Sequence, residues 1–417
     1  MPEVFLGLNI EVWKYASMPF LSAIVGYVTN VVAIKMMFHP ITFWGVWEPW
    51  LGWQGIVPRK AAKMASISVD TITEKLITEE EIFSRMDPQR VAEELRAPML
   101  SMVEEITDSV MLQHQPTIWR NLPEPVRRTI VRRIQKDAPE VVEEIMQDVR
   151  QNIREMFDLK DMVVANLVRN KPLINRIFLE TGHAEFKFIA RSGLYFGFLF
   201  GCVQMGVWVL YKGWWLLPAF GLLVGWATNW LALKMIFNPK ELVRVGPLRV
   251  QGLFHKRQYE VARDYGNLVA DEIVTPGNIL EAILKGPYSD RIVTLIDGHV
   301  QRAIDEQTGY AKPFVTMTVG NARYNDIKQT AVAQVVAHMP ETFRHVTSYA
   351  EEAMQIKSTL VTRLQGLNSI EFEGMLRPAF EEDEWILITV GAALGFAVGW
   401  FQLVVLFGDE FAAAFGG

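Results

Sequence analysis

A fifteen-residue motif occurs twice in the chain, and this repetition constrains the fold more than any other feature. The first copy runs from Gly26 to Pro40 (GYVTNVVAIKMMFHP) and the second from Gly225 to Pro239 (GWATNWLALKMIFNP). Eight of the fifteen positions are identical, where average composition predicts about one. The copies lie 199 residues apart in a chain of 417. We therefore interpret the chain as a tandem duplication.

Two further patterns repeat at nearly the same spacing. Gln54-Gly55 returns as Gln251-Gly252, 197 residues later. A row of three glycines at intervals of four, followed by a glutamine, returns after 198 residues; its members are Gly193, Gly197, Gly201 and Gln204 in the first half and Gly391, Gly395, Gly399 and Gln402 in the second. The repeat therefore extends across most of the chain.

Four stretches are apolar enough to cross a bilayer, which takes a helix of roughly 20 residues. They span 19–38, 192–211, 213–237 and 385–407, and their only charged residues are Lys35 and Lys234. A signal peptide fits the first stretch poorly, because a basic region and a small-residue cleavage site are missing. We predict an integral membrane protein that retains all four spans.

Each half has the same plan, namely a span, a long insert (39–191 or 238–384) and a second span. Two spans per half return the chain to its starting side, so we expect parallel repeats. Basic residues gather on the insert side; they are Arg59, Lys60, Lys187, Arg191, Lys240, Arg244, Arg249, Lys256, Arg257 and Arg377, against Lys14 and Lys212 on the other side. The positive-inside rule then predicts cytoplasmic inserts, with the N-terminus and the tail 408–417 outside.

The inserts show helical periodicity. Apolar residues follow one helix face in 142–156 and again in 356–367. Thr78-x-x-Glu81, Asp87-Pro88 and Thr275-Pro276 have the form of helix starts. Prolines are expected to divide the inserts into several helices; they are Pro116, Pro123, Pro125, Pro172, Pro287, Pro313 and Pro340. We predict an all-α protein whose apolar stripes form the cores of helical bundles. An apolar groove continuous with the membrane, holding an acyl chain, is the alternative.

Small and polar residues share one face of the first and third spans. Gly26, Thr29, Asn30 and Ala33 fall at i, i+3, i+4 and i+7, as do Gly225, Thr228, Asn229 and Ala232. Because an unpaired amide in hydrocarbon is costly, both asparagines should face protein or a wet cavity. The favoured interpretation is the packing seam of a four-helix membrane bundle. The alternative is a polar site or path between the halves.

The other two spans and the two lysines complete this picture. The repeated glycines and Gln204 or Gln402 lie on one face, where small residues allow close approach of helices. Lys35 and Lys234 lie opposite the polar face, near the insert side, where they can snorkel to the headgroups. Binding of an anionic headgroup by these lysines is the alternative.

Four tryptophans follow the first span at three-residue intervals, namely Trp44, Trp47, Trp50 and Trp53. Indoles prefer the membrane interface, so this segment is expected to lie along the membrane surface. The second half has no tryptophan at the matching place. Gln54-Gly55 and Gln251-Gly252, each soon followed by a basic pair (Arg59-Lys60 and Lys256-Arg257), are expected to form the turn into each insert, and phosphate contact is the alternative.

Several functional classes are disfavoured by composition. The net charge of −6 and pI near 5.8 argue against a nucleic-acid partner. The single Cys202 excludes intramolecular disulfides and cysteine-based metal clusters. His183-Ala-Glu185 lacks the downstream cysteine pair of a zinc deaminase, and no zinc-protease, serine-hydrolase or phosphate-loop motif occurs. We expect neither enzyme activity nor a metal or other cofactor.

The Thr-Asn motif, the Gln-Gly element and the region from Glu371 to Gln402 resemble the YheB-like bacterial membrane family, a domain of unknown function numbered four-four-five. The resemblance implies a bacterial inner-membrane protein with helical domains, and it carries no activity with it. Members usually show one span near each end, so the central pair of spans here is a departure.

We expect a non-enzymatic membrane protein that handles or senses membrane lipid, or moves a small solute, through the seam between the repeats. The alternative is a scaffold whose helical inserts recruit cytoplasmic proteins. Expected partners are membrane lipid and, as an open alternative, a second copy of the chain or another protein. Sensitivity to substitution at Thr29, Asn30, Thr228 and Asn229 would favour the first function, and sensitivity on exposed insert faces the second.

Overall fold

The computed structural model describes residues 4–5, 8–48, 50–245, 248–309, 320–377, 381 and 384–408. Its helical content confirms the all-α prediction. Four helices are long and apolar enough to cross a membrane, as predicted; they are α1 (Ile10–Phe38), α11 (His183–Leu210), α12 (Leu216–Phe237) and α23 (Glu384–Leu406). Helix α1 continues through Pro19, where the predicted span began. The C-terminal tail from 409 onward lies outside the described residues.

The shorter elements connect and extend these four helices. The other helices are α2 (Ile56–Arg59), α3 (Ala61–Thr71), η1 (Ile72–Leu76), α4 (Glu79–Ser84), α5 (Pro88–Glu94), α6 (Arg96–His114), α7 (Pro116–Asn121), α8 (Glu124–Met156), α9 (Leu159–Arg169), α10 (Lys171–Thr181), α13 (Leu253–Lys256), α14 (Gln258–Glu272), α15 (Pro276–Lys285), α16 (Ser289–Thr308), α18 (Asn321–Phe343), α19 (Thr347–Met354), α20 (Ile356–Gly366) and α21 (Ser369–Leu376). Three antiparallel pairs of strands join β1 (Val4–Phe5) to β2 (Leu8–Asn9), β3 (Trp44–Trp47) to β4 (Leu51–Trp53), and β5 (Val243–Val245) to β6 (Leu248–Val250).

The chain folds into two compact units, and each unit takes residues from both halves. Unit 1 contains the four apolar helices and comprises residues 1–71, 167–266 and 361–417. Unit 2 comprises residues 72–166 and 267–360. The central parts of the two inserts, predicted as separate helical domains, therefore pack with one another in unit 2.

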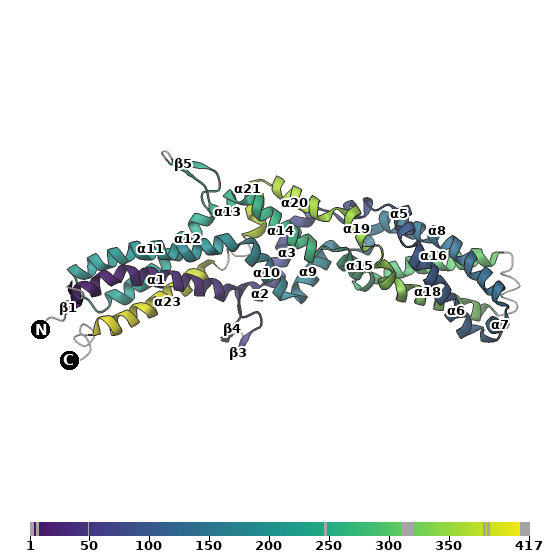
Figure 1. Ribbon diagram of the computed structural model, residues 1–417, viewed down its shortest axis with the longest axis horizontal. Coiled ribbons are helices and arrows are strands. Elements are labelled where there is room, and N and C mark those ends of the chain that lie inside the picture. The colour runs from purple at the N-terminus through teal and green to yellow at the C-terminus, as the bar shows by residue number, and fades with distance from the viewer. Residues whose placement is uncertain are drawn as a thin grey trace. The chain divides into compact units, whose positions relative to one another are not determined.

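In unit 1, the apolar helices form two antiparallel hairpins, α1 with α11 and α12 with α23 (Figure 1). Within each hairpin, the two helices contact each other at glycine residues. A Cβ added at Gly26 would collide with the backbone of Gly193, and a Cβ at Gly225 would collide with the backbone of Gly391. Farther along, Gly197 lies against the backbone of Ser22, and Gly395 against that of Gly221. Both hairpins therefore depend on backbone contact that any larger residue would prevent.

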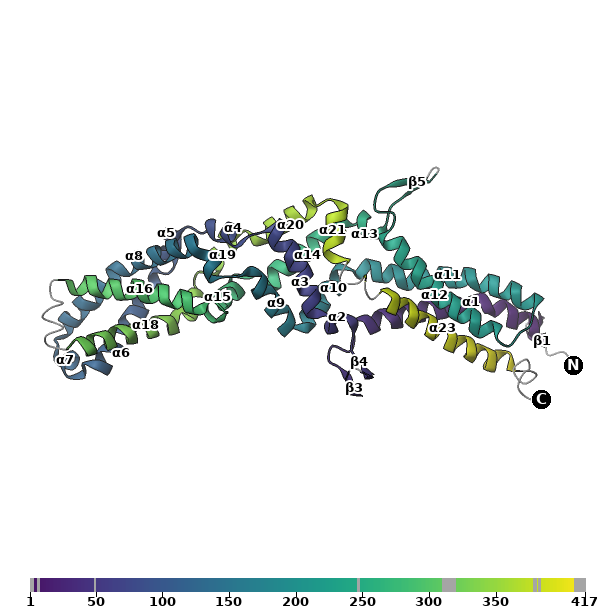
Figure 2. The same ribbon diagram turned by 180° about the vertical axis from the view of Figure 1, so that it is seen from behind.

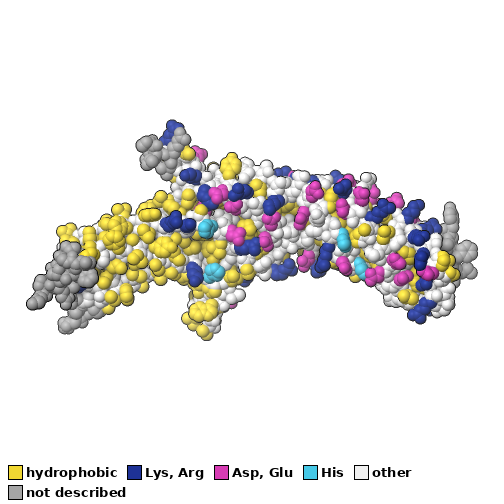
Figure 3. Space-filling view, in the orientation of Figure 1, with side chains coloured by type: hydrophobic (Ala, Val, Ile, Leu, Met, Phe, Trp, Pro, Cys, Tyr) yellow, Lys and Arg dark blue, Asp and Glu magenta, His cyan; other side chains and the backbone are white. Residues whose placement is uncertain are grey.

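The two hairpins run in the same direction. A buried cluster joins the beginnings of α1 and α12 to the ends of α11 and α23, through Met18, Leu217, Trp208 and Phe407. Figure 2 shows the four helices side by side from the opposite face. Over these helices the molecular surface is dominated by hydrophobic side chains (Figure 3). This surface is the one expected to face lipid.

The predicted turns into the inserts are present. Gly55 and Gly252 are the N-cap residues of α2 and α13, with φ/ψ of −52°/142° and −54°/139°. Each glycine donates its backbone N–H to a motif proline, Pro40 or Pro239, at 2.9 Å. In both halves the residues between the motif and this turn form a β-hairpin. These hairpins were not predicted, because the strands are only three or four residues long and follow no clear alternation.

Unit 2 is a bundle in which α6, α8, α16 and α18 pack against one another. The predicted stripe in α8 is an internal one, since Val149, Ile153 and Met156 are buried. Thr78, Asp87 and Thr275 cap α4, α5 and α15 as predicted. Pro340 was expected to divide helices, and this expectation is wrong, because it lies inside α18. Pro313 lies outside the described residues.

An apolar hollow of about 310 Å³ also lies in unit 2. Its lining includes Phe83, Met146, Ile279, Met339 and Phe343. The predicted bundle core thus contains a space that an apolar group can enter. The predicted acyl-chain groove stays a prediction.

Glycine contact in the hairpins gives a direct prediction within one helix. Gly193→Leu places a side chain against the backbone of α1, which should cost at least about 2–3 kcal/mol and lower the apparent melting temperature by roughly 5–10 °C. Gly206→Leu is the matched control in α11, because a Cβ at Gly206 meets nothing within 4 Å. Thermal aggregation of the detergent-solubilised protein, followed by size-exclusion chromatography, measures both. Equal melting temperatures for the two variants would contradict the packing.

Candidate functional site

The polar seam residues predicted from sequence are buried within their own hairpins. Asn30 donates its side-chain amide to the carbonyl of Ile189 at 2.7 Å, and Asn229 donates to Leu387 at 2.9 Å. Thr29 and Thr228 turn back to the carbonyls of Gly26 and Gly225, at 3.2 and 3.4 Å. Each asparagine thus bridges two antiparallel helices across the glycine contact. The Asn and Thr side chains have the contacts of a packing seam.

The two glutamines differ between the hairpins. Gln204 accepts a hydrogen bond from the Ser22 hydroxyl at 2.9 Å and is buried. Gln402 is also buried, and its side-chain nitrogen has no hydrogen-bond partner among the described residues. The position matching Ser22 is Gly221, so the second hairpin lacks the hydroxyl that donates to the glutamine in the first.

Lys35 and Lys234 are exposed on the side of their helices away from the seam. Lys234 lies over the Trp230 ring, with its Nζ 5.8 Å from the ring centroid. This placement agrees with a lysine that extends along the helix surface. The structure does not bring the lysines to the polar seam.

A pocket lies where the two hairpins meet, at the end that leads into the inserts. It has a volume of about 80 Å³ and is lined from both sides. The first half contributes mainly Met37, Phe186 and Ile189, and the second half contributes Ile236, Leu387 and Glu384 at the matching positions. The two walls of the pocket therefore come from equivalent positions in the two halves but differ in chemistry. Phe186 in the first half is the equivalent of Glu384 in the second.

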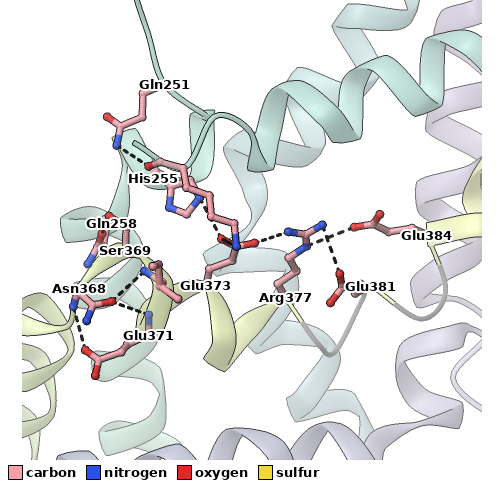
Figure 4. A network of polar contacts seen from close by, with 12 residues as sticks. Gln251, His255, Gln258, Asn368, Ser369, Glu371, Glu373, Arg377, Glu381 and Glu384 are labelled. Carbon is pink, nitrogen blue, oxygen red and sulfur yellow. Dashed lines mark hydrogen bonds and ion pairs between the residues drawn. The ribbon is translucent and has the colours of Figure 1, made fainter. Parts of the chain in front are cut away.

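The second-half wall continues into a network of charged side chains (Figure 4). Its centre is Glu373 on α21, whose side chain is only 4% exposed. One carboxylate oxygen lies 3.1 Å from Lys240 Nζ and 3.4 Å from His255 Nε2. The other accepts a hydrogen bond from Arg377. A buried carboxylate is thus held by two cations and one histidine, as a buried charge requires.

Arg377 connects this network to the pocket. Its guanidinium lies 3.5 Å from Glu381 and 3.9 Å from Glu384, and it stacks over Phe237 with 5.1 Å to the ring centroid. Both Arg377 and Glu384 line the pocket. Arg377 Nε and Glu384 Oε1 are buried and make no hydrogen bond within the described part of the chain. These two atoms face each other at 3.9 Å, in an ion pair too long for a hydrogen bond, and the pocket presents this pair beside an apolar wall.

A second ion pair crosses from one half to the other. Arg257, just after α13, donates to both carboxylate oxygens of Glu185 at 2.8 and 2.9 Å. Glu185 belongs to α11 and also lines the pocket. Arg257 additionally binds Glu260 at 3.0 Å. This contact fixes the first turn of α11 against the second half.

Burial and charge shift the pKa values in the network. Burial lowers the pKa of His255, and the nearby Glu373 carboxylate offsets that shift only in part. Burial raises the pKa of Glu373, but the hydrogen bonds and charges of Arg377 and Lys240 outweigh burial and hold it below its ordinary value. At neutral pH the network therefore contains an ionised Glu373 and a neutral His255.

Among its described residues, the first half has no such network. The positions that match the charged residues are uncharged throughout; Lys240, His255, Glu373, Arg377 and Glu384 correspond to Ile41, Pro58, Asn175, Leu179 and Phe186. Asn175 instead donates its amide to the carbonyl of Phe38 at 2.5 Å. Equivalent positions in the two halves thus form a neutral corner around Asn175 in the first half and a charged corner around Glu373 in the second.

From the sequence, Lys240 and Arg377 were used only to predict orientation and Arg257 also as part of a basic pair after the second Gln-Gly element, while Glu373 and His255 were not predicted as site residues. Charged residues near a span end are commonly solvated, so their burial here was not evident. A comparison of the two halves position by position would have found them, because every member replaces an uncharged counterpart.

Removal of the central carboxylate should be costly. Glu373→Ala leaves Arg377 and Lys240 without their buried partner, and we expect a loss of about 3 kcal/mol in unfolding free energy. Asp271→Ala is the control, since Asp271 pairs with Lys357 in an exposed position at 2.7 Å and should cost less than about 1 kcal/mol. Urea-induced unfolding in detergent micelles measures both. Similar losses would show that Glu373 is not a buried anchor.

The lowered pKa of His255 predicts acid sensitivity. The unfolded chain binds a proton at His255 below about pH 6.5, while the folded chain resists it, so stability is lost as the pH falls through that value. His255→Gln should therefore show a smaller drop in melting temperature between pH 7.5 and 5.5 than the parent. His345→Gln, at an exposed histidine, is the control. An unchanged pH dependence in His255→Gln would contradict the burial argument.

Part of the chain is similar in sequence to known proteins. The profile of a family described as "Protein of unknown function (DUF445)" matches residues 20–117. UPF0754 membrane proteins are similar over short segments: that of Staphylococcus carnosus is 32% identical over 85 residues, which cover 20% of this chain and 23% of the relative. That of a Nostoc species is 39% identical over 75 residues, covering 17% and 18%.

The chain therefore matches less than a quarter of the length of these curated relatives. Even so, the matched segment carries the first motif copy, and the predicted resemblance is confirmed. Over residues 20–117 the chain is similar to the DUF445 family, and over shorter segments it is similar to UPF0754 membrane proteins.

Proposed function

We propose that this membrane protein is a non-enzymatic protein of the bacterial inner membrane that binds a membrane lipid in the pocket between its two hairpins. The proposal assumes that the two hairpins are tandem repeats with the same orientation in the membrane. It also assumes that their inserts are cytoplasmic. The pocket then lies at the cytoplasmic ends of the spans, at the depth of the lipid headgroups. Its volume admits part of a headgroup, while the acyl chains stay in the bilayer.

One observation carries the proposal, namely the combination of an apolar wall with a buried ion pair, Arg377 with Glu384, that is too long for a hydrogen bond. Arg377 Nε and Glu384 Oε1 are paired with each other at 3.9 Å, which is too long for a hydrogen bond, so each can still take a closer partner. A zwitterionic headgroup supplies both, through its phosphate and its ammonium group. Met37, Phe186 and Ile189 offer the apolar contact that the glycerol region requires. We therefore favour phosphatidylethanolamine as the lipid class.

The internal bonds of the seam favour this site over a solute path. The side-chain amides of Asn30 and Asn229 donate hydrogen bonds to the carbonyls of Ile189 and Leu387 within their own hairpins. A path for a solute along these side chains would require both bonds to open. Lipid binding at the end of the hairpins requires no such change.

The scaffold alternative has one observation in its favour. Apolar side chains are exposed on the adjoining helices α6, α7 and α8 of unit 2; they are Leu100, Leu112, Ile118, Val126 and Ile130. A protein partner could cover them. Loss of function on substitution here, with the pocket tolerant, would favour a scaffold.

Photocrosslinking tests the lipid site directly. The full chain in nanodiscs that contain phosphatidylethanolamine with a diazirine near the glycerol should be labelled on the pocket-lining segments 178–189 and 233–237. Leu233→Trp fills the pocket from α12 and should reduce this labelling at least tenfold. Met235→Trp is the control, because Met235 is exposed on the same helix and does not line the pocket.

Two outcomes would contradict different parts of the proposal. Equal labelling of the two tryptophan variants would reject the pocket as the lipid site. Equal labelling by a phosphatidylglycerol probe would reject the zwitterion preference, because that headgroup has no ammonium to bind Glu384.

A further inference from the structure

We propose that the β3–β4 hairpin is a lateral membrane anchor whose tip inserts into the headgroup region of the bilayer beside α1. This inference rests on the surface of the hairpin and its attachment, and it is independent of the lipid pocket. The hairpin covers residues 44–53 and follows directly after the first motif.

The hairpin exposes apolar side chains along its length to an unusual degree. Trp44 is 78% exposed, Val46 95%, Trp47 68%, Trp50 82% and Leu51 62%. Five large apolar side chains on a short projection form a contiguous patch, which Figure 3 shows standing out from the molecule. Patches of this kind mark contact with a partner or a membrane.

The depth of the hairpin is fixed by its attachment to α1. The indole nitrogen of Trp53 donates to the carbonyl of Met36, in the last turn of α1, at 3.1 Å. Gln54 donates its side-chain amide to the carbonyl of Ile41 at 2.8 Å. Both bonds hold the base of the hairpin where the span ends. The tip therefore projects sideways from the level of the headgroups.

Close strand contact makes the hairpin a defined shape. Gly45 and Gly52 face each other across the ladder, and a Cβ at either would collide with the backbone of the other strand. The strands consequently approach closely, and the tryptophans are carried on a narrow ribbon. A narrow ribbon can enter the interface with little displacement of lipid.

The chemistry of the tip indicates a lipid surface as the partner. Tryptophan combines an apolar ring with one N–H and concentrates at membrane interfaces. Glu48 is the single charged residue between Phe43 and Trp53. The hydrophobic surface of the spans lies next to the end of α1, where Lys35 and His39 are exposed beside the hairpin. The matching β5–β6 segment carries Arg244 and Arg249 and no tryptophan, so only the first half has this anchor.

Site-specific fluorescence tests the insertion. In a Cys202→Ser background, Val46→Cys is labelled with an environment-sensitive fluorophore, and the full chain is placed in nanodiscs with or without brominated phospholipid. Insertion predicts a blue-shifted emission and at least twofold quenching by the brominated lipid. Ser101→Cys, on an exposed polar position of α6, is the control and should show neither effect.

Two results would overturn the proposal. A label at position 46 that aqueous iodide quenches and brominated lipid does not would place the tip in water. A label shielded from both quenchers would mean that protein covers the tip. Replacement of Trp44, Trp47 and Trp50 by serine should abolish the lipid quenching and leave the melting temperature of the protein within a few degrees of the parent, because these side chains pack on nothing in the core.

Discussion

The rest of unit 1 depends on the backbone contact between paired glycines. In hydrocarbon there is little hydrophobic drive between helices, so association relies on close packing and on hydrogen bonds between helices. Gly26 against Gly193 supplies the close packing in one hairpin, and Gly225 against Gly391 supplies it in the other. At the same level, Asn30 and Asn229 bond to carbonyls of the opposite helix. The glycines allow the approach and the asparagines fix the register, because a shift along either helix would separate amide from carbonyl.

Much of this arrangement was predictable, because its signals are local or periodic. The apolar length of each span, the spacing of Gly193, Gly197 and Gly201, and the caps at Thr78, Asp87 and Thr275 each follow from a few neighbouring residues. The sequence repeat also allowed the pairing of the spans to be predicted, because each half contains one span before its insert and one after it.

The remainder depends on partners far apart in the chain. Glu373 pairs with Arg377 on the next turn of the same helix, but its contact with Lys240 comes from a distant part of the chain, and no single stretch of sequence indicates that contact. The same holds for unit 2, where α8 and α16 come from different halves. The β-hairpins escaped prediction for another reason, since their strands are too short for alternation to be visible. Pro340 shows the limit of a local rule, because a proline inside α18 is tolerated where the packing of the helix demands continuity.

The neutral corner around Asn175 and the charged corner around Glu373 have a consequence for how such a protein can be assembled. A half-length chain that paired with itself would place two identical walls across the pocket, either Phe186 against Phe186 or Glu384 against Glu384. A single chain that carries both halves places one of each. The covalent joining of the copies therefore gives the cavity a direction, and any molecule that enters it meets a hydrocarbon side and an ionic side that cannot be exchanged by symmetry.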